Sequence, residues 1–143
     1  MGRIGKRVLS WTLCLMMAVG MLPGMTRKAK ATAPDVGISW DSDNNRYVIS
    51  NYAGLVEFAN IVNGTGSHAG NANRSACAVI SDEVDSIDAS ASASADSSWT
   101  PIGKDTSLIY TGTFDGNGKE ITRLTIDNDS TDYIGLFGIV GPR

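Results

Sequence analysis

The spacing of apolar residues changes along this chain and predicts one helix among several short strands. Residues 38–49 place aromatic and aliphatic positions on both sides of a polar Asp-Asn-Asn stretch, a pattern typical of two strands around a turn. One apolar stripe at helical spacing follows: Leu55, Phe58, Ala59 and Val62. We expect this helix to begin near Tyr52, behind a Ser50 or Asn51 cap, and to end at Asn63-Gly64.

Beyond this helix the pattern predicts short strands separated by polar or glycine-rich turns. Residues 76–80 form a short apolar run, whereas residues 89–95 alternate Ala and Ser and predict a flexible, low-complexity surface insertion. Residues 114–118, Phe-Asp-Gly-Asn-Gly, predict a tight turn because Asp-Gly and Asn-Gly accept positive φ. A phosphate-binding loop is not favoured there, because no helix and no Lys-Ser/Thr pair follow. Apolar residues at 121–126 and 134–137 predict two further strands.

The N-terminus indicates an exported protein. Arg3, Lys6 and Arg7 precede an apolar run over residues 8–22, which is shorter than the roughly 20 residues of a membrane-spanning helix. This pattern is typical of a secretory signal peptide over residues 1–31, cleaved after Ala31 or after Ala33; an uncleaved N-terminal anchor is the alternative. The sequence therefore predicts a secreted or cell-surface location and, after cleavage, no membrane segment.

Removal of this leader makes the chain strongly acidic. The whole sequence carries a net charge of −3, but residues 1–31 hold six of its twelve basic residues and none of its fifteen acidic ones. The six bases and fifteen acids that remain give −9, which disfavours nucleic-acid partners. Cys77 is then the only cysteine, so no disulfide can form within the chain. Its apolar neighbours predict a buried, inert thiol.

Individual polar residues give no strong sign of catalysis, and we assign no catalytic, cofactor-binding or metal-binding residue. His68 is the only histidine and is predicted to be a solvated loop residue. Asp41, Asp43 and Asn45 alternate as in a calcium loop but lack its central Gly and later Glu, so a plain turn is favoured. The acidic run over residues 82–88 could serve glycosidase or calcium chemistry, but is more typical of a solvated edge.

The last third of the chain resembles a known class of surface proteins. The motifs that carry the resemblance are Trp99-Thr100-Pro101-Ile102-Gly103, Tyr110–Gly118, Ile121-x-x-Leu124-x-Ile126 and Tyr133-Ile134-Gly135-Leu136-Phe137-Gly138. They are similar to segments of bacterial right-handed parallel β-helix proteins that carry the so-called GLUG repeat. The upstream helix resembles the capping helix of those proteins, and the similarity spans roughly residues 49–141.

This resemblance implies a mainly β fold, the N-terminal part of a right-handed parallel β-helix (a solenoid) with one short capping helix. Residues 32–49 would form an N-terminal β segment, and residues 50–141 the capping helix and the first coil or coils, interrupted by the insertion at 89–95. Because about three repeats are needed for a stable solenoid, we expect an incomplete fragment. A complete small protein that self-associates through its open end is the alternative.

The resemblance further implies a non-enzymatic adhesin or cell-wall-associated protein, with cell-surface glycans or host or cell-wall components as partners and with no cofactor. Three aromatic residues are candidates for a binding surface: Trp40, Trp99 and Tyr110. All three are nevertheless predicted to be packing residues. The alternative is part of a β-helix carbohydrate-active enzyme, a polysaccharide lyase or glycosidase, for which the nearby bases are Lys104, Lys119 and Arg123. A calcium-binding module is a third possibility, and its candidate ligands are Asp82, Asp85, Asp88, Asp115 and Asp127.

Overall fold

The computed structural model describes residues 36–94, 98–127 and 132–142. The description below concerns the unit Pro34–Arg143. The predicted signal peptide and both predicted cleavage sites lie outside the described residues, and so does the last position of the Ala-Ser stretch at 89–95.

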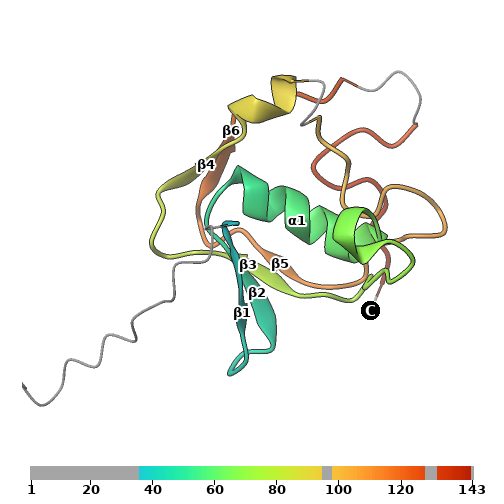
Figure 1. Cartoon of the computed structure of the whole chain (residues 1–143), viewed down its shortest axis with the longest axis horizontal. Coiled ribbons are helices and arrows are strands. Elements are labelled where there is room, and N and C mark those ends of the chain that lie inside the picture. Colours follow the sequence, from blue (N-terminus) through green and yellow to red (C-terminus); the bar gives the residue numbers. More distant parts are fainter. Residues whose placement is uncertain (1–35, 95–97, 128–131, 143) are drawn as a thin grey trace, which may run out of the picture. The chain divides into compact units, whose positions relative to one another are not determined.

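Two small sheets organise this unit (Figure 1). Strands β1 (Ile38–Asp41) and β2 (Arg46–Ile49) form the predicted antiparallel hairpin around a polar turn. β2 then pairs in parallel with β3 (Ala78–Ile80), which pairs in parallel with β5 (Phe114–Asp115), giving the order β1-β2-β3-β5. The second sheet consists of β4 (Ser86–Asp88) and β6 (Glu120–Thr122), which are also parallel.

The predicted helix is confirmed as α1 (Tyr52–Asn63). Asn51 is its N-cap, and its side-chain Oδ1 accepts a hydrogen bond from the Gly54 N–H at 2.9 Å. Gly64 ends the helix in the left-handed conformation, with φ of 64°. The apolar stripe faces the sheets, and Leu55, Phe58, Ala59 and Val62 are all buried. Two short 3-10 helices follow, η2 (Gly66–His68) and η3 (Ser90–Ala93).

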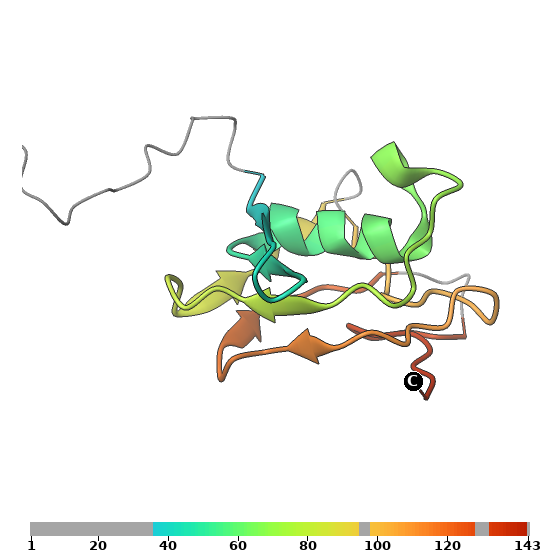
Figure 2. The ribbon, with the colours of Figure 1, turned by 90° about the horizontal axis from the view of Figure 1, so that it is seen from below.

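The chain beneath α1 runs in successive levels, each paired in parallel with the next (Figure 2). We call the last of these the outer level: β5, β6 and residues 133–140, which make single-residue bridges at Phe137 and Val140. The inward-facing residues of the level above it are buried, whereas their partners on the outer level are not. Ile102 is 0% exposed but its bridge partner Phe137 is only half-buried, and Tyr110 is 2% exposed but its partner Val140 is 61% exposed.

The predicted fold class is wrong. Instead of the N-terminal part of a mainly β, right-handed parallel β-helix, the described residues form two small sheets and one α-helix, a modest mixed α/β arrangement with neither a closed nor a solenoid sheet. The physical reason is that the ladders are short. The strands have two to four residues, the first pair is antiparallel, and left-handed residues at Asn117 and Arg123 follow β5 and β6.

Two local predictions also need correction. The strand expected at 134–137 is reduced to an isolated bridge between Phe137 and Ile102. The Ala-Ser stretch is ordered over its described part, where it forms η3. Ser92 is 2% exposed there, donates to the Ala89 carbonyl at 2.6 Å and accepts from the Thr125 N–H at 2.7 Å. A serine hydroxyl that satisfies buried backbone groups makes this segment part of the packed unit.

Candidate functional site

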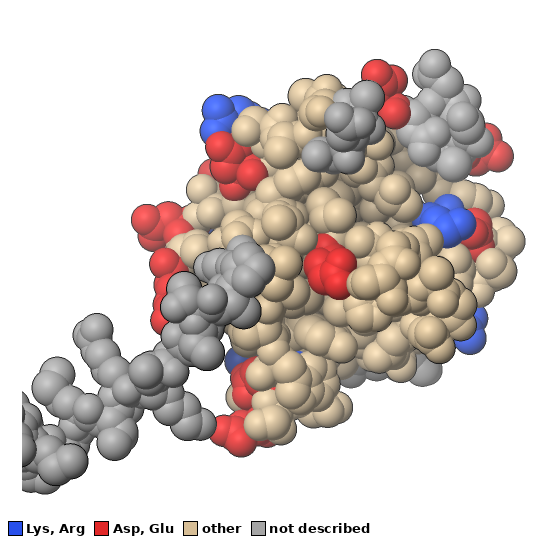
Figure 3. Space-filling model, in the orientation of Figure 1, with Lys and Arg blue, Asp and Glu red and all other residues tan. Residues whose placement is uncertain are grey.

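A groove beside α1 is the candidate site. It has a volume of about 580 Å³, which lies within the range typical of small-molecule sites. One wall is α1 from its N-cap Asn51 to Asn60, and the other is formed by Ala91 of η3 with Ser98 and Thr100. In Figure 3 one acidic patch lies near the middle of the view and is surrounded by uncharged surface, while the other acidic and basic side chains lie mainly around the margin.

The apolar lining residues of the groove, which we call its floor, have mostly small side chains. Ala53 and Val56 contribute from α1 and Ala91 contributes from η3, and the largely buried Tyr52 also lines the groove. Ala53 and Ala91 are exposed, so the floor is accessible from solvent. An apolar surface of this kind makes van der Waals contact with the C–H groups of a ligand and needs no charged group on that ligand.

We call the polar lining residues of the groove its rim, and two amides among them are held in place by α1. Asn51 is fixed as the N-cap of α1. Asn60 donates from Nδ2 to Glu57 Oε2 at 3.3 Å and accepts at Oδ1 from the Thr65 hydroxyl at 2.8 Å. An amide has two donor hydrogens and two acceptor lone pairs, so its bonds to other described residues leave Asn60 with a further donor and a further acceptor for a ligand. The rim therefore presents oriented hydrogen-bonding groups.

The remaining rim residues are Asp88, Ser98 and Thr100, all of which are exposed. Asp88 accepts from the Ser90 N–H at 2.9 Å and forms an ion pair with Arg123. The hydrogen bond from Ser90 is the main reason that the pKa of Asp88 is lowered, and Arg123 adds to the effect. Among the described residues that line the groove, none is Lys, Arg or His.

The three aromatic candidates separate into two classes. Trp99 and Tyr110 are packing residues as predicted: each is 2% exposed, and their polar atoms donate to the carbonyls of Gly135 at 3.0 Å and Ala76 at 2.9 Å. The same prediction is wrong for Trp40, which is 52% exposed. Its ring packs edge-to-face on Tyr47, with centroids 4.8 Å apart. Trp40 lies on β1, away from the residues that line the groove.

His68 is bonded to α1, which the sequence did not predict. His68 Nε2 lies 3.0 Å from Glu57 Oε1, and the Ser67 hydroxyl donates to the same oxygen at 3.1 Å. Partial burial raises the pKa of Glu57, but hydrogen bonds from Asn60, His68 and Ser67 outweigh it, so the pKa is lowered. Because serine and histidine both contact the carboxylate, this cluster fastens η2 to α1 and has no nucleophile–base arrangement.

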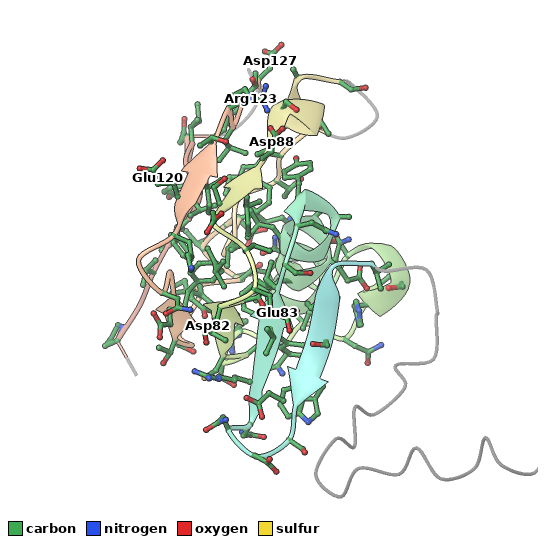
Figure 4. All side chains as sticks on the ribbon, turned by 90° about the vertical axis from the view of Figure 1, so that its left-hand side faces the viewer. Asp82, Glu83, Asp88, Glu120, Arg123 and Asp127 are labelled. Atoms are coloured by element: carbon green, nitrogen blue, oxygen red, sulfur yellow. The ribbon has the colours of Figure 1, made fainter. Side chains whose placement is uncertain are left out.

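The acidic residues lie on a solvated edge, as predicted. Asp82, Glu83, Asp85 and Asp88 are exposed, and Figure 4 shows Asp82 and Glu83 well apart from Asp88. Within the ranges that the structure describes, no three His, Cys, Asp or Glu residues are grouped to hold a metal ion. The three candidate bases lie in different surroundings. Lys104 forms an ion pair with Asp105 at 2.8 Å, Arg123 forms one with Asp88, and Lys119 lies directly before β6.

Two further local predictions can be checked. The turn at 41–45 is a plain turn as expected, because Asp41 accepts from the Asn44 side chain at 2.7 Å and Asn45 adopts φ of 51°. Cys77 is half-buried rather than buried, so that prediction is wrong. Its Sγ lies 3.7 Å from the Ser75 carbonyl.

No sequence signal identified the groove, because its walls come from segments far apart in the chain. The outward-facing positions of α1, residues 53, 56 and 60, were visible at helical spacing, but nothing indicated that residues 91, 98 and 100 lie opposite them. Their approach depends on the pairing of β4 with β6 and on the packing of η3, which are long-range contacts.

Comparison with known proteins gives limited similarity. No protein-family model matches the chain, and no solved structure matches it. Over 43 residues, or 30% of this chain, it is 44% identical to Halomucin of Haloquadratum walsbyi (strain DSM 16790 / HBSQ001); the match covers a share of Halomucin that rounds to 0% of its length. This partial similarity is compatible with a surface or extracellular protein. Across the described ranges, no helix is both long and apolar enough to cross a membrane.

Proposed function

We propose that this chain is an exported protein that acts at the cell surface by binding rather than by catalysis, in the manner of an adhesin or a cell-wall-associated protein. The observation that carries the proposal is the 43-residue similarity to Halomucin. The signal-peptide pattern of residues 1–31 and the resemblance of residues 99–138 to GLUG-carrying surface proteins support it. Cell-surface glycans or wall components are the proposed partners.

The structure supports binding through the character of its surface groups. The rim of the groove presents amides and hydroxyls, and the carboxylate of Asp88 is already paired with Arg123. A retaining or inverting glycosidase needs two carboxyl groups at a defined separation, one of them with a raised pKa. The pKa of Asp88 is lowered, which suits an acceptor of hydrogen bonds better than a proton donor.

Export can be tested by expressing the full chain with a C-terminal tag and separating cytoplasm, envelope and medium. We expect the tagged protein in the envelope or the medium, with a new N-terminus at Thr32 or Pro34. Replacing Arg3, Lys6 and Arg7 by Glu should retain it in the cytoplasm with Met1 or Gly2 at its start, because the basic n-region directs insertion. Cytoplasmic retention of the unmodified chain would contradict the proposal.

Binding and catalysis are distinguished by incubating the purified chain with isolated cell-wall polysaccharide. Binding alone predicts co-sedimentation with the polymer and no release of reducing ends or unsaturated products over hours. Release of either product would favour the carbohydrate-active enzyme instead.

A further inference from the structure

We propose that the groove beside α1 binds a neutral saccharide, a ligand rich in hydroxyl groups and free of charge. The inference deepens the proposed function and rests on it, because it names the class of glycan and the surface that contacts it. Its basis is the combination of a cavity of about 580 Å³ with an apolar floor and a polar, cation-free rim.

The charge of the lining disfavours anionic ligands. Sites for phosphates, sulfates and uronates place Arg or Lys against the anion, because desolvating an unpaired anion is costly. The described residues that line this groove include no such cation, and Asp88 adds a carboxylate to its rim. Arg123 pairs with this carboxylate and is not itself a lining residue. An anionic sugar would therefore find no cation among the described lining residues to offset the cost of its desolvation.

The hydrogen-bonding groups of the rim suit hydroxyls. A hydroxyl donates one hydrogen bond and accepts up to two, so it pairs best with groups that offer both functions. With respect to the residues that the structure describes, Asn60 keeps a further donor and a further acceptor position, and the exposed hydroxyl residues Ser98 and Thr100 line the same groove from another segment. The ionised Asp88 accepts from hydroxyl groups strongly. These groups come from both walls, so one ligand can contact them together.

The apolar floor of the groove suits the C–H faces of a sugar ring. A pyranose carries C–H groups on its faces and hydroxyls around its edge, which suits a lining that combines small aliphatic side chains with polar groups. Ala53 and Ala91 have the smallest side chains that still cover the backbone, and they leave room for a ring above them. A basic peptide is the competing ligand because Asp88 adds a carboxylate to the lining, and an oligolysine probe separates it from a saccharide.

The test is a titration of the full chain with maltohexaose, cellohexaose, mannohexaose and N-acetylchitohexaose, followed by backbone amide shifts in NMR. An oligogalacturonate and an oligolysine serve as anionic and basic probes. We expect saturable binding of at least one neutral oligosaccharide, with shifts concentrated at residues 51–60, 88–91 and 98–100. Binding by the anionic probe should be at least tenfold weaker. Equal or tighter binding of the oligogalacturonate or the oligolysine, or no binding of any neutral probe, would overturn the inference.

Variants locate the site. Ala53→Trp fills the groove from an exposed position and should lower the affinity at least tenfold. Ala69→Trp makes the same change at an exposed position outside the groove and should leave the affinity within twofold. The double variant Ser98→Ala/Thr100→Ala removes only two exposed hydroxyls, so it keeps the test decisive if Ala53→Trp folds poorly; we expect at least threefold weaker binding. Unchanged affinity in a folded Ala53→Trp and in the double variant would refute the site.

The saccharide-binding test and the export test can fail independently of each other. A chain that is exported and retained at the surface but binds no neutral saccharide refutes this inference alone. A chain that binds the saccharide through the groove but remains in the cytoplasm refutes the surface function and leaves the site.

Discussion

Replacing Asn63 by Ala tests the main polar connection between α1 and the rest of the unit. Asn63 is the last residue of α1 and only 3% exposed. Its Nδ2 donates to the Pro101 carbonyl at 2.9 Å, and its Oδ1 accepts from the N–H groups of Gly103 at 3.1 Å and Lys104 at 3.2 Å. One side chain therefore satisfies three backbone groups that lie 38 to 41 residues away.

The expected loss follows from the burial of those groups. A buried polar group left without a partner costs about 1–3 kcal/mol. Two of the three hydrogen bonds are buried, and the third, to Lys104, is partly exposed so that water can replace it. We therefore expect Asn63→Ala to lower the free energy of unfolding by about 3 kcal/mol, a large share of the roughly 5–15 kcal/mol typical of a small domain.

Urea unfolding followed by circular dichroism measures this loss. With a slope of about 1–2 kcal/mol per M, the midpoint should fall by about 1.5–3 M. Asn44→Ala is the matched control, because its side chain bonds only to Asp41, at 2.7 Å on the exposed turn, and should cost at most about 0.5 kcal/mol. If both variants lose the same small amount, the buried connection contributes little and the reasoning fails.

Three further predictions follow from other contacts. Gly54→Ala should destabilise the protein by about 2 kcal/mol or more although Ala favours helix, because its Cβ would lie 1.9 Å from the Gly37 carbonyl oxygen; a raised melting temperature would contradict this. The hydrogen bond from Lys104 is the main cause that lowers the pKa of Asp105 to about 2, so its stabilising effect is complete above pH 3.8 and is lost as the pH falls toward 2. Asp105→Asn should accordingly show a smaller drop in urea midpoint between pH 5 and pH 2 than the unmodified chain, and an equal drop would argue against the pairing. Ile134→Lys should reduce concentration-dependent association in sedimentation velocity, because Ile134 is 60% exposed on the outer level; identical profiles would exclude that surface.

Features set by neighbouring residues could be predicted from the sequence. The helix α1 was predictable because its cap at Asn51, its apolar spacing and its Gly64 terminus are all local. The β1–β2 hairpin was predictable for the same reason, since its turn lies between the two strands. Local chemistry of this kind acts within a few residues and does not depend on the remainder of the fold.

Features set by distant pairing could not be predicted. Which short strands pair, and how far each ladder continues, depends on contacts such as Ala78 with Phe114, and the predicted fold class failed at this point. The composition of the Ala-Ser stretch predicted a flexible segment, but the Ser92 hydroxyl accepts a hydrogen bond from the Thr125 N–H, 33 residues away. The alternation of β1 did not reveal that Trp40 extends beyond the core, so its exposure was missed. The groove is likewise the product of three separated segments.

The outer level is more exposed than the level above it, so we expect this unit to unfold locally at the outer level before it unfolds globally. β3 is hydrogen-bonded on both sides, to β2 and to β5, whereas β5 and β6 are each bonded on one side only. Local opening that releases β6 and residues 133–140 breaks fewer contacts than global unfolding, so amide protons there should exchange with solvent faster than those of β3 and α1. The outer level then behaves as a separate cooperative segment, and a state that has lost it can still retain the helix and the hairpin.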